Sequence, residues 1–265
     1  MKILRCIKLI AFTSLIIYGC SNEVDNPSFQ YSPVVEGYLY AGLPLEVKIS
    51  QQVPYSSDLD TLLYNMDTLS VRIFYKNLYH NLLPIGDGKY INSNININQS
   101  DSFRLEFYYN NLSISAKTTI PEKPKNFQSS SYTIHVSDNI FDENNPSELK
   151  FSWDNPDGSF YFLLIENIEP KPTPIFDNSN VSTISQSFNL TPTQSGNYSM
   201  NTRRFLYYGN HRIILFHIRS DLAILYEEND NTSQTISNPY SEIENAFGIF
   251  TGINSDTIYL NVGSQ

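Results

Sequence analysis

Residues 149–166 read LKFSWDNPDGSFYFLLIE, and this stretch decides the fold. Its first five residues are predicted to form a β-strand that ends in Trp153, and residues 160–166 are predicted to form a second strand rich in apolar and aromatic side chains. Between the two, Asp154-Asn155-Pro156-Asp157-Gly158 contains the residue types that favour tight turns. The segment therefore predicts two strands joined by a proline-containing turn.

This pattern resembles the hairpin of strands B and C in fibronectin type III domains. There, as here, a strand that ends in Trp153 is followed by a turn around Pro156 and a strand that opens with the aromatic residue Phe160. The resemblance implies a β-sandwich in the second half of the chain.

The rest of the second half shows short segments in which apolar and polar residues alternate, the pattern of strands with one buried face. Strands are predicted at residues 132–136, 183–190, 202–206, 212–218 and 257–262. Ser220-Asp221 has the residue types of a helix N-cap, and residues 222–228 are predicted as a short helix.

The first half gives a similar strand series. Strands are predicted at residues 34–40, 45–50, 69–75, 79–83, 89–91, 103–109 and 112–116, with tight turns at Lys76-Asn77 and Asn110-Asn111. Pro121-Glu122-Lys123-Pro124 cannot continue a central strand, so residues 121–125 are predicted as a linker. We therefore expect an all-β protein with two immunoglobulin/fibronectin-III-like β-sandwich domains, residues 31–120 and 126–265, and a short helix in the second.

Composition narrows the class of function. The chain has 19 Tyr and 16 Phe against one Trp and three Met, which favours an all-β fold. Tyrosine is also typical of sugar-binding and partner-binding surfaces, but half-exposed strand positions account for it better. The formal net charge of −10, with no run of Lys and Arg, argues against a nucleic-acid partner.

The first 19 residues are predicted to be a signal peptide. Lys2, Arg5 and Lys8 precede an apolar core that is too short to span a bilayer. The core ends in Ile17-Tyr18-Gly19-Cys20, which resembles the lipobox of bacterial lipoproteins, and this resemblance implies that Cys20 becomes the acylated first residue of the mature protein, palmitate being one such acyl chain. Residues 20–30 are then a polar, acidic tether.

Cysteine usage agrees with lipidation. The chain has two cysteines, and Cys6 lies inside the segment that would be removed. A mature exported chain with its single cysteine at the cleavage point fits lipid attachment better than disulfide pairing. The alternative is an ordinary signal peptide that contains a cysteine. Acidic residues close behind Cys20 resemble the signal that sends lipoproteins of Bacteroidota to the cell surface.

The run NPYSEIENAFGIFTG (residues 238–252) resembles the C-terminal signature of a family of Bacteroidota lipoproteins, the domain of unknown function 4249 family. Ala246 replaces a glycine that is usual there. Further agreement lies in the lipobox, in Val34-Val35-Glu36-Gly37, in Gly88-Lys89-Tyr90, in Thr118-Thr119-Ile120-Pro121, and in the strand and helix of residues 212–228. The resemblance implies an outer-membrane lipoprotein encoded beside a TonB-dependent receptor, and it carries over no catalytic or binding residue. From the residues alone, 238–252 is a buried loop and strand, with a partner-docking surface as the alternative.

No catalytic, cofactor-binding or metal-binding residue is predicted. The histidines, His80, His135, His211 and His217, have no metal-ligand spacing, and neither a G-x-S-x-G elbow nor a phosphate-binding loop is present. Calcium at Asp154, Asp157 and residues 142–143 is an alternative that turn formation explains better. Three tripeptides resemble an O-glycosylation motif of exported Bacteroidota proteins, with acceptors at Thr61, Thr68 and Thr257.

We therefore expect a non-enzymatic, surface-exposed lipoprotein of the outer membrane. Its partner would be a TonB-dependent outer-membrane receptor that takes up a nutrient, and its ligand is not predicted. The alternatives are a surface adhesin or structural protein of the envelope, and a hydrolase.

Overall fold

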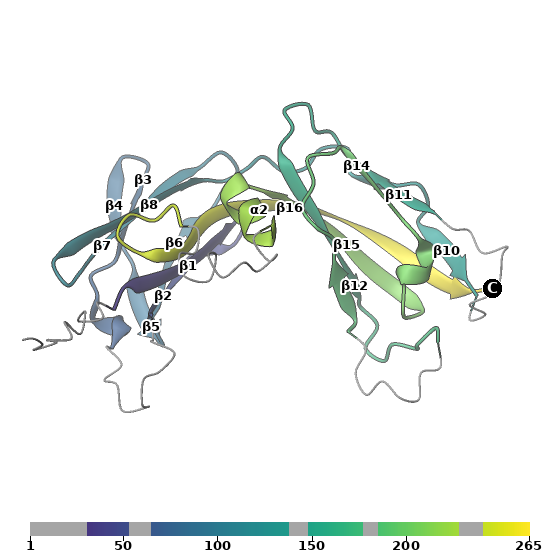
Figure 1. Cartoon of the computed structure of the whole chain (residues 1–265), viewed down its shortest axis with the longest axis horizontal. Helices are drawn as coiled ribbons and strands as arrows, with labels where there is room; N and C mark the ends of the chain where they lie inside the picture. Colours follow the sequence, from purple (N-terminus) through teal and green to yellow (C-terminus); the bar gives the residue numbers. More distant parts are fainter. Residues whose placement is uncertain (1–30, 53–64, 138–147, 177–184, 228–240) are drawn as a thin grey trace, which may run out of the picture. The chain divides into compact units, whose positions relative to one another are not determined.

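The computed structural model describes residues 31–52, 65–137, 148–176, 185–227 and 241–265 of the chain. The signal peptide, Cys20, the tether, Thr61, residues 142–143 and residues 238–240 lie outside the described residues. The described chain is all-β, with one short α-helix and two single turns of 3₁₀ helix (Figure 1). No described helix has both the length and the apolar character needed to cross a membrane. Ser32–Gln265 forms one compact unit.

The first sandwich has two facing sheets. One contains β1 (Pro33–Tyr40), β2 (Pro44–Gln51), β6 (Lys89–Asn96) and β5 (Leu83–Gly86), in that order. The other has the order β4 (Leu78–Asn81), β3 (Arg72–Tyr75), β7 (Ser102–Tyr109) and β8 (Leu112–Thr119). Alternate residues of β7 point inward, so Phe103, Leu105 and Phe107 are buried in the core between the sheets, as the period-two pattern predicts.

The two tight turns of this sandwich confirm the hairpins expected from the sequence. Lys76 and Asn77 have φ angles of 49° and 63°, and Asn110 and Asn111 have φ angles of 48° and 64°. Two successive residues with positive φ make the type I′ turn, whose twist matches that of antiparallel strands. These turns join β3 to β4 and β7 to β8.

The second sandwich has the strand order of a fibronectin type III domain. One sheet contains β13 (Ser187–Asn189), β12 (Phe160–Asn167), β15 (Gly209–Ile218) and the C-terminal part of β16 (Phe247–Ser264), with β10 (Thr133–Val136) pairing to β16. The other contains β14 (Asn197–Met200), β11 (Leu149–Ser152) and β9 (Gln128–Ser129). The stretch of residues 149–166 supplies β11 to one sheet and β12 to the other, and Trp153 between them is buried beside Phe127 and Tyr161.

One predicted strand is wrong. Residues 202–206 do not form a strand; Thr202–Arg204 forms a single 3₁₀ turn, η2. The side-chain oxygen of Asn201 accepts a hydrogen bond of 2.8 Å from the backbone N–H of Arg203, which starts this turn. The strand lies just before it, at β14. The short helix is confirmed as α2 (Ser220–Glu227).

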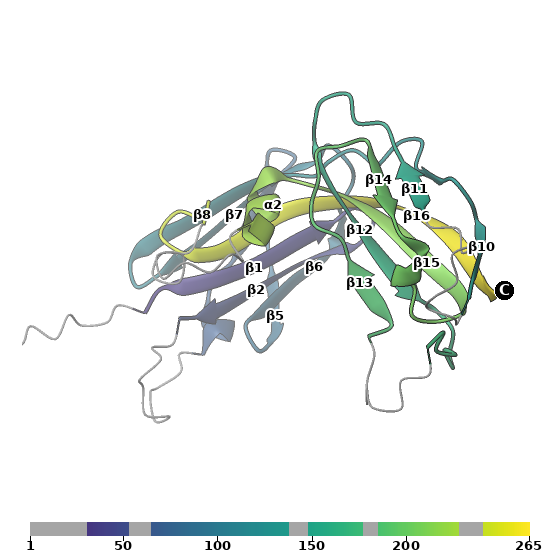
Figure 2. The same cartoon turned by 45° about the vertical axis from the view of Figure 1, so that its right-hand side comes forward.

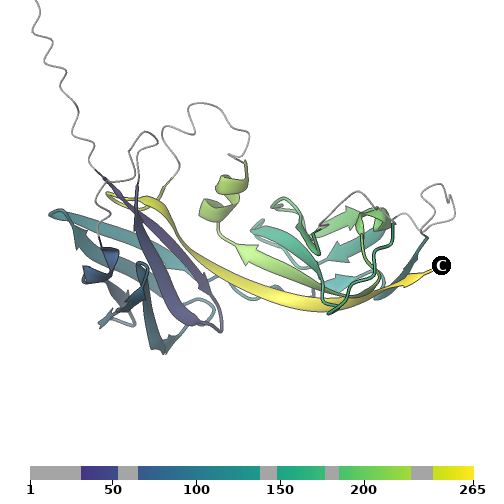
Figure 3. The same cartoon turned by 90° about the horizontal axis from the view of Figure 1, so that it is seen from below.

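The final strand, β16, is longer than the predicted strand 257–262 and belongs to both sandwiches (Figures 2 and 3). It pairs in parallel with β1, from Val34 opposite Phe247 to Tyr40 opposite Ile253. From Ile253 onward it pairs antiparallel with β15. A single nine-stranded sheet therefore extends from the first sandwich into the second. The domain limits 31–120 and 126–265 remain predictions.

Small residues allow β1 and β16 to lie close together. Gly248 has φ of 103°, and a Cβ atom at this position would lie 2.0 Å from the carbonyl oxygen of Val35. On β1, a Cβ atom at Gly37 would lie 2.5 Å from Cδ2 of Phe250. Both glycines are therefore required by the close approach of the two strands.

Candidate functional site

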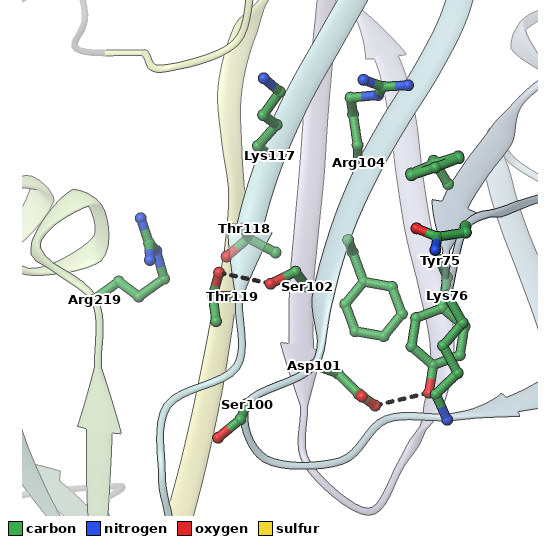
Figure 4. Close-up of a pocket in the computed structure, with 13 residues that line it drawn as sticks. Tyr75, Lys76, Ser100, Asp101, Ser102, Arg104, Lys117, Thr118, Thr119 and Arg219 are labelled. Atoms are coloured by element: carbon green, nitrogen blue, oxygen red, sulfur yellow. Dashed lines mark hydrogen bonds between the residues drawn. The ribbon is translucent and has the colours of Figure 1, made fainter.

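A cavity of about 560 Å³ lies against the outer face of the first sandwich (Figure 4). Strands β3, β7 and β8 form its floor. Arg219, which connects β15 to α2, approaches it from the second sandwich. We call this cavity the cationic groove, because Lys76, Arg104, Lys117 and Arg219 line it.

Only one carboxylate, that of Asp101, is among the lining residues, and it already has partners. Its Oδ2 atom accepts hydrogen bonds of 2.9 Å from the Tyr75 hydroxyl and 2.9 Å from the backbone N–H of Asn98. Four cations and one occupied carboxylate therefore line the groove, in a chain whose net charge is −10. Two of the cations, Arg104 and Arg219, are also paired with carboxylates outside the lining, those of Glu106 and Asp221.

The side chain of Arg104 is held in place by its neighbours. Its Nε atom lies 2.6 Å from Oε1 of Glu106, and its Nη2 atom donates a hydrogen bond of 2.8 Å to the Tyr79 hydroxyl. The guanidinium also lies 4.9 Å from the centroid of the Phe74 ring. Bonds in fixed directions and an aromatic contact orient the group before any ligand arrives.

Lys117 lies directly opposite Arg104 in the register of β7 and β8. Its side chain is exposed, and it forms no ion pair or hydrogen bond with the described residues. Figure 4 shows the two side chains next to each other on the same face of the sheet. Like charges opposite each other on neighbouring strands repel and destabilise the sheet, so this pair is not explained by stability.

Hydroxyl groups complete the groove. Oγ of Ser102 and Oγ1 of Thr119 lie 3.2 Å apart across β7 and β8, and Ser100 lines the same cavity. Figure 4 shows Thr119 and Ser102 below the Arg104–Lys117 pair, with Arg219 to the left. The groove thus offers cations and hydroxyl donors to a ligand.

A second cavity, of about 490 Å³, shares Thr119 and Arg219 with the cationic groove. It contains His217, whose ring stacks on Tyr161 with centroids 4.5 Å apart and whose Nδ1 donates to the backbone carbonyl of Glu122 at 2.8 Å. Burial lowers the pKa of His217, and burial together with nearby acidic residues raises the pKa of Tyr161 to about 12. At neutral pH both groups are therefore uncharged, and they serve as packing and hydrogen-bonding groups.

A third cavity, of about 400 Å³, is aromatic. Tyr38 and Tyr40 of β1, Phe162 of β12 and Tyr226 of α2 line it. Burial raises the pKa of both Tyr38 and Tyr40, so their hydroxyls stay protonated at neutral pH. This cleft suits apolar or planar groups and gathers part of the tyrosine excess seen in the sequence.

The remaining histidines and the calcium alternative contribute no site. Nδ1 of His135 lies 3.0 Å from the backbone oxygen of Ser264 at the end of β16. Asp154 accepts a hydrogen bond of 2.7 Å from Asn126, and hydrogen bonds, chiefly from Ser159, lower the pKa of Asp157. Within the described residues, no group of acidic, His and Cys side chains could hold a metal ion.

His211 makes stability depend on pH. Its Nδ1 pairs with the carbonyl of Gly209 at 3.1 Å, and its Nε2 lies 3.3 Å from the Asn167 amide nitrogen. Because the carbonyl can only accept, Nδ1 carries the proton and Nε2 accepts from Asn167. Burial lowers the pKa of His211 below its ordinary value of 6.5. A second proton, on Nε2, would point at the N–H donor of Asn167, and this contact also disfavours the charged form of His211.

The unfolded chain binds a proton at His211 more tightly than the folded chain does. We therefore expect the unfolding free energy to be highest above pH 6.5, and to fall as the pH drops toward the lower pKa that His211 has in the folded state. Urea unfolding at pH 8 and at pH 5 measures the difference in unfolding free energy between the two pH values. His211→Asn should reduce it, and the surface substitution His135→Gln serves as the matched control. An equal reduction in both variants would contradict the assignment to His211.

Two of the three predicted glycosylation acceptors lie within the described residues. Thr68 is exposed in the 3₁₀ turn η1 (Met66–Thr68), and its hydroxyl donates to the carbonyl of Asn65 at 3.0 Å. Thr257 is exposed on β16. These sites, like lipidation at Cys20, remain predictions.

Sequence reasoning missed the cationic groove. The available signal was modest: Arg104 and Lys117 are outward positions of two strands predicted to form a hairpin, and its register places them opposite each other. The contribution of Arg219 follows only from the way β16 joins the two sandwiches.

Comparison with solved structures returns a multidomain segment of titin, with a TM-score of 0.21 and 6% identity, over 71% of this chain and 61% of that chain. It also returns the central fibronectin-III array of RIM-binding protein, with a TM-score of 0.23 and 8% identity, over 89% of this chain and 69% of that chain. This chain thus spans 61% of the titin segment. No family model and no curated protein sequence matches the chain. The fold assignment therefore rests on the strand order given above.

Proposed function

We propose that the protein is a non-enzymatic binding lipoprotein. It is anchored in the outer membrane through lipid on Cys20, exposed at the cell surface, and works beside a TonB-dependent receptor in nutrient uptake. The lipobox and the resemblance to the domain of unknown function 4249 family support the location and the partner.

The observation that carries the binding role is the cationic groove. Its central guanidinium, on Arg104, is held by Glu106 and Tyr79, and its floor is a hydrogen-bonded sheet. A site whose groups are oriented in advance loses little conformational entropy when a ligand binds. The uncharged state of His217 and Tyr161 at neutral pH fits a binding role for the neighbouring cavity as well.

The anchor is tested by fractionation. The wild-type protein should remain with the outer membrane, because several acyl chains hold it there, and Cys20→Ala should be found in the soluble periplasmic fraction or as unprocessed precursor. Labelling with a radioactive or clickable fatty acid checks the lipid directly. Incorporation of the label into Cys20→Ala would contradict attachment at Cys20.

The partner is tested by purification from native membranes under gentle detergent. We expect a large outer-membrane β-barrel to purify with the protein at a constant ratio. Recovery of the protein alone, at the size of a monomer, would contradict the receptor-associated role.

The second candidate is a surface adhesin or structural envelope protein, and β16 favours it. This one strand belongs to both sandwiches, so it would carry a pulling force from one to the other. A deletion strain that loses attachment to surfaces while its nutrient uptake is unchanged would favour this candidate over the first.

A further inference from the structure

We propose that the cationic groove binds a small organic polyanion, a molecule with two or more carboxylate or phosphate groups. This deepens the proposed function and rests on it, because it takes the groove to be the ligand site of a binding protein.

The first support is the distribution of charge. The chain has 17 Lys and Arg against 27 Asp and Glu, yet the groove gathers four cations and a single carboxylate, Asp101. Tyr75 and Asn98 already occupy that carboxylate. A concave surface lined by one sign of charge concentrates the field and attracts ligands of the opposite sign.

The second support is the like-charge pair of Arg104 and Lys117. The two face each other across β7 and β8, and only Arg104 has a carboxylate partner among the described residues. An oxyanion placed between them would accept hydrogen bonds from both and would turn a repulsive pair into a binding pair. This position forms one pole of the groove.

Arg219 forms the second pole. It reaches the groove from the second sandwich, where its Nε lies 3.5 Å from Oδ2 of Asp221, and Ser102 and Thr119 line the same groove (Figure 4). A ligand that reaches both poles needs two anionic groups, and the hydroxyls of Ser102 and Thr119 can bond to its other polar atoms. A ligand with one anionic group satisfies only one pole.

Size and net charge favour a small molecule over a long polymer. The groove volume of about 560 Å³ lies within the range of about 300–1,000 Å³ that is typical of small-molecule sites. Beyond the groove, a protein of net charge −10 repels a long anionic chain. A compact polyanion receives the local attraction without that repulsion.

The test is isothermal titration calorimetry on the full chain in mild non-ionic detergent at low salt. Citrate represents a polycarboxylate, pyrophosphate a phosphate compound, acetate a single carboxylate, and heparin a long polyanion. We expect citrate or pyrophosphate to bind, with an affinity that falls as salt is added, and acetate to bind far more weakly. Whichever of citrate and pyrophosphate binds more tightly identifies the anionic group.

Lys117→Gln should weaken this binding about tenfold, the loss of one charge-assisted hydrogen bond. Lys89→Gln is the matched control, because Lys89 is exposed on β6 of the opposite sheet and forms no ion pair with the described residues. Lys89→Gln should leave the affinity unchanged.

Three outcomes would overturn the proposal: no binding of citrate or pyrophosphate at millimolar concentration, binding of heparin alone, or equal weakening by the two substitutions. Co-purification with a receptor is measured separately, so failure of that experiment and failure of this one are distinguishable.

Discussion

Gly248→Ala is expected to destabilise the protein by more than about 4 kcal/mol, whereas Gly86→Ala should cost only about 1 kcal/mol. The two glycines have nearly the same φ angle, 103° and 102°. They differ in their surroundings. A Cβ atom at Gly248 would lie 2.0 Å from the Val35 carbonyl oxygen, whereas one at Gly86 would have no atom within 4 Å.

The comparison separates two contributions to the cost of replacing a glycine. Gly86→Ala measures the conformational cost alone, since the added methyl group meets nothing. Gly248→Ala adds the separation of β1 from β16, which breaks backbone hydrogen bonds along the parallel pair. Urea unfolding followed by circular dichroism gives both values. Similar losses in the two variants would show that β1 and β16 can move apart at little cost.

Phe250→Ala is expected to cost about 3–5 kcal/mol, the usual range for removal of a buried phenylalanine ring. Phe250 is only 4% exposed. It lies on β16, yet it packs in the core of the first sandwich, where its ring lies over Gly37 of β1. The cavity left by the ring cannot be filled easily, because the strands around it are fixed by their pairing.

This variant also tests whether the two sandwiches unfold together. Trp153 is the only tryptophan and lies in the core of the second sandwich, so its fluorescence reports on that sandwich, whereas circular dichroism reports on the whole chain. We expect both signals to shift to lower urea by the same amount, because β16 is common to both sandwiches. Tyr259→Ala, on the same strand and 60% exposed, should change stability by less than about 0.5 kcal/mol. An unchanged fluorescence transition in Phe250→Ala would contradict coupled unfolding.

Local patterns predicted most of the strands and the class of the fold. Alternation placed β7 and β8, and Asn110-Asn111 identified the turn between them, because both signals act over a few residues. The strand predicted at residues 202–206 is wrong for a local reason too, since Asn201 caps a 3₁₀ turn there. Such capping competes with extended structure and leaves little trace in the hydrophobic pattern.

The sequence could not predict the double role of β16, because its partners lie far away along the chain. Parallel pairing with β1 joins residues about 210 positions apart, and no local signal reports such a contact. The cationic groove depends on the same contact, since Arg219 reaches it only when β16 has joined the sandwiches. The Arg104–Lys117 pair, in contrast, follows from the hairpin register alone.

Several segments that carry the family resemblance meet in space. Val34-Val35-Glu36-Gly37 pairs with residues 247–250, and a Cβ atom at Gly252 would lie 2.5 Å from the carbonyl oxygen of Thr119. These motifs therefore have a structural reason, the close joining of β1, β8 and β16. Residues 247–252 form a strand that is partly to fully buried, as the structural interpretation of that run predicts.

The position of β16 also determines the order in which the molecule can be completed. A chain is synthesised from its N-terminus, so β1 is made early and β16 is made last of the described strands. Until β16 arrives, one edge of β1 has no neighbour, and unpaired strand edges are sites where chains associate with each other. The first sandwich is thus completed only by the last described strand to be synthesised, and until then β1 keeps an open edge.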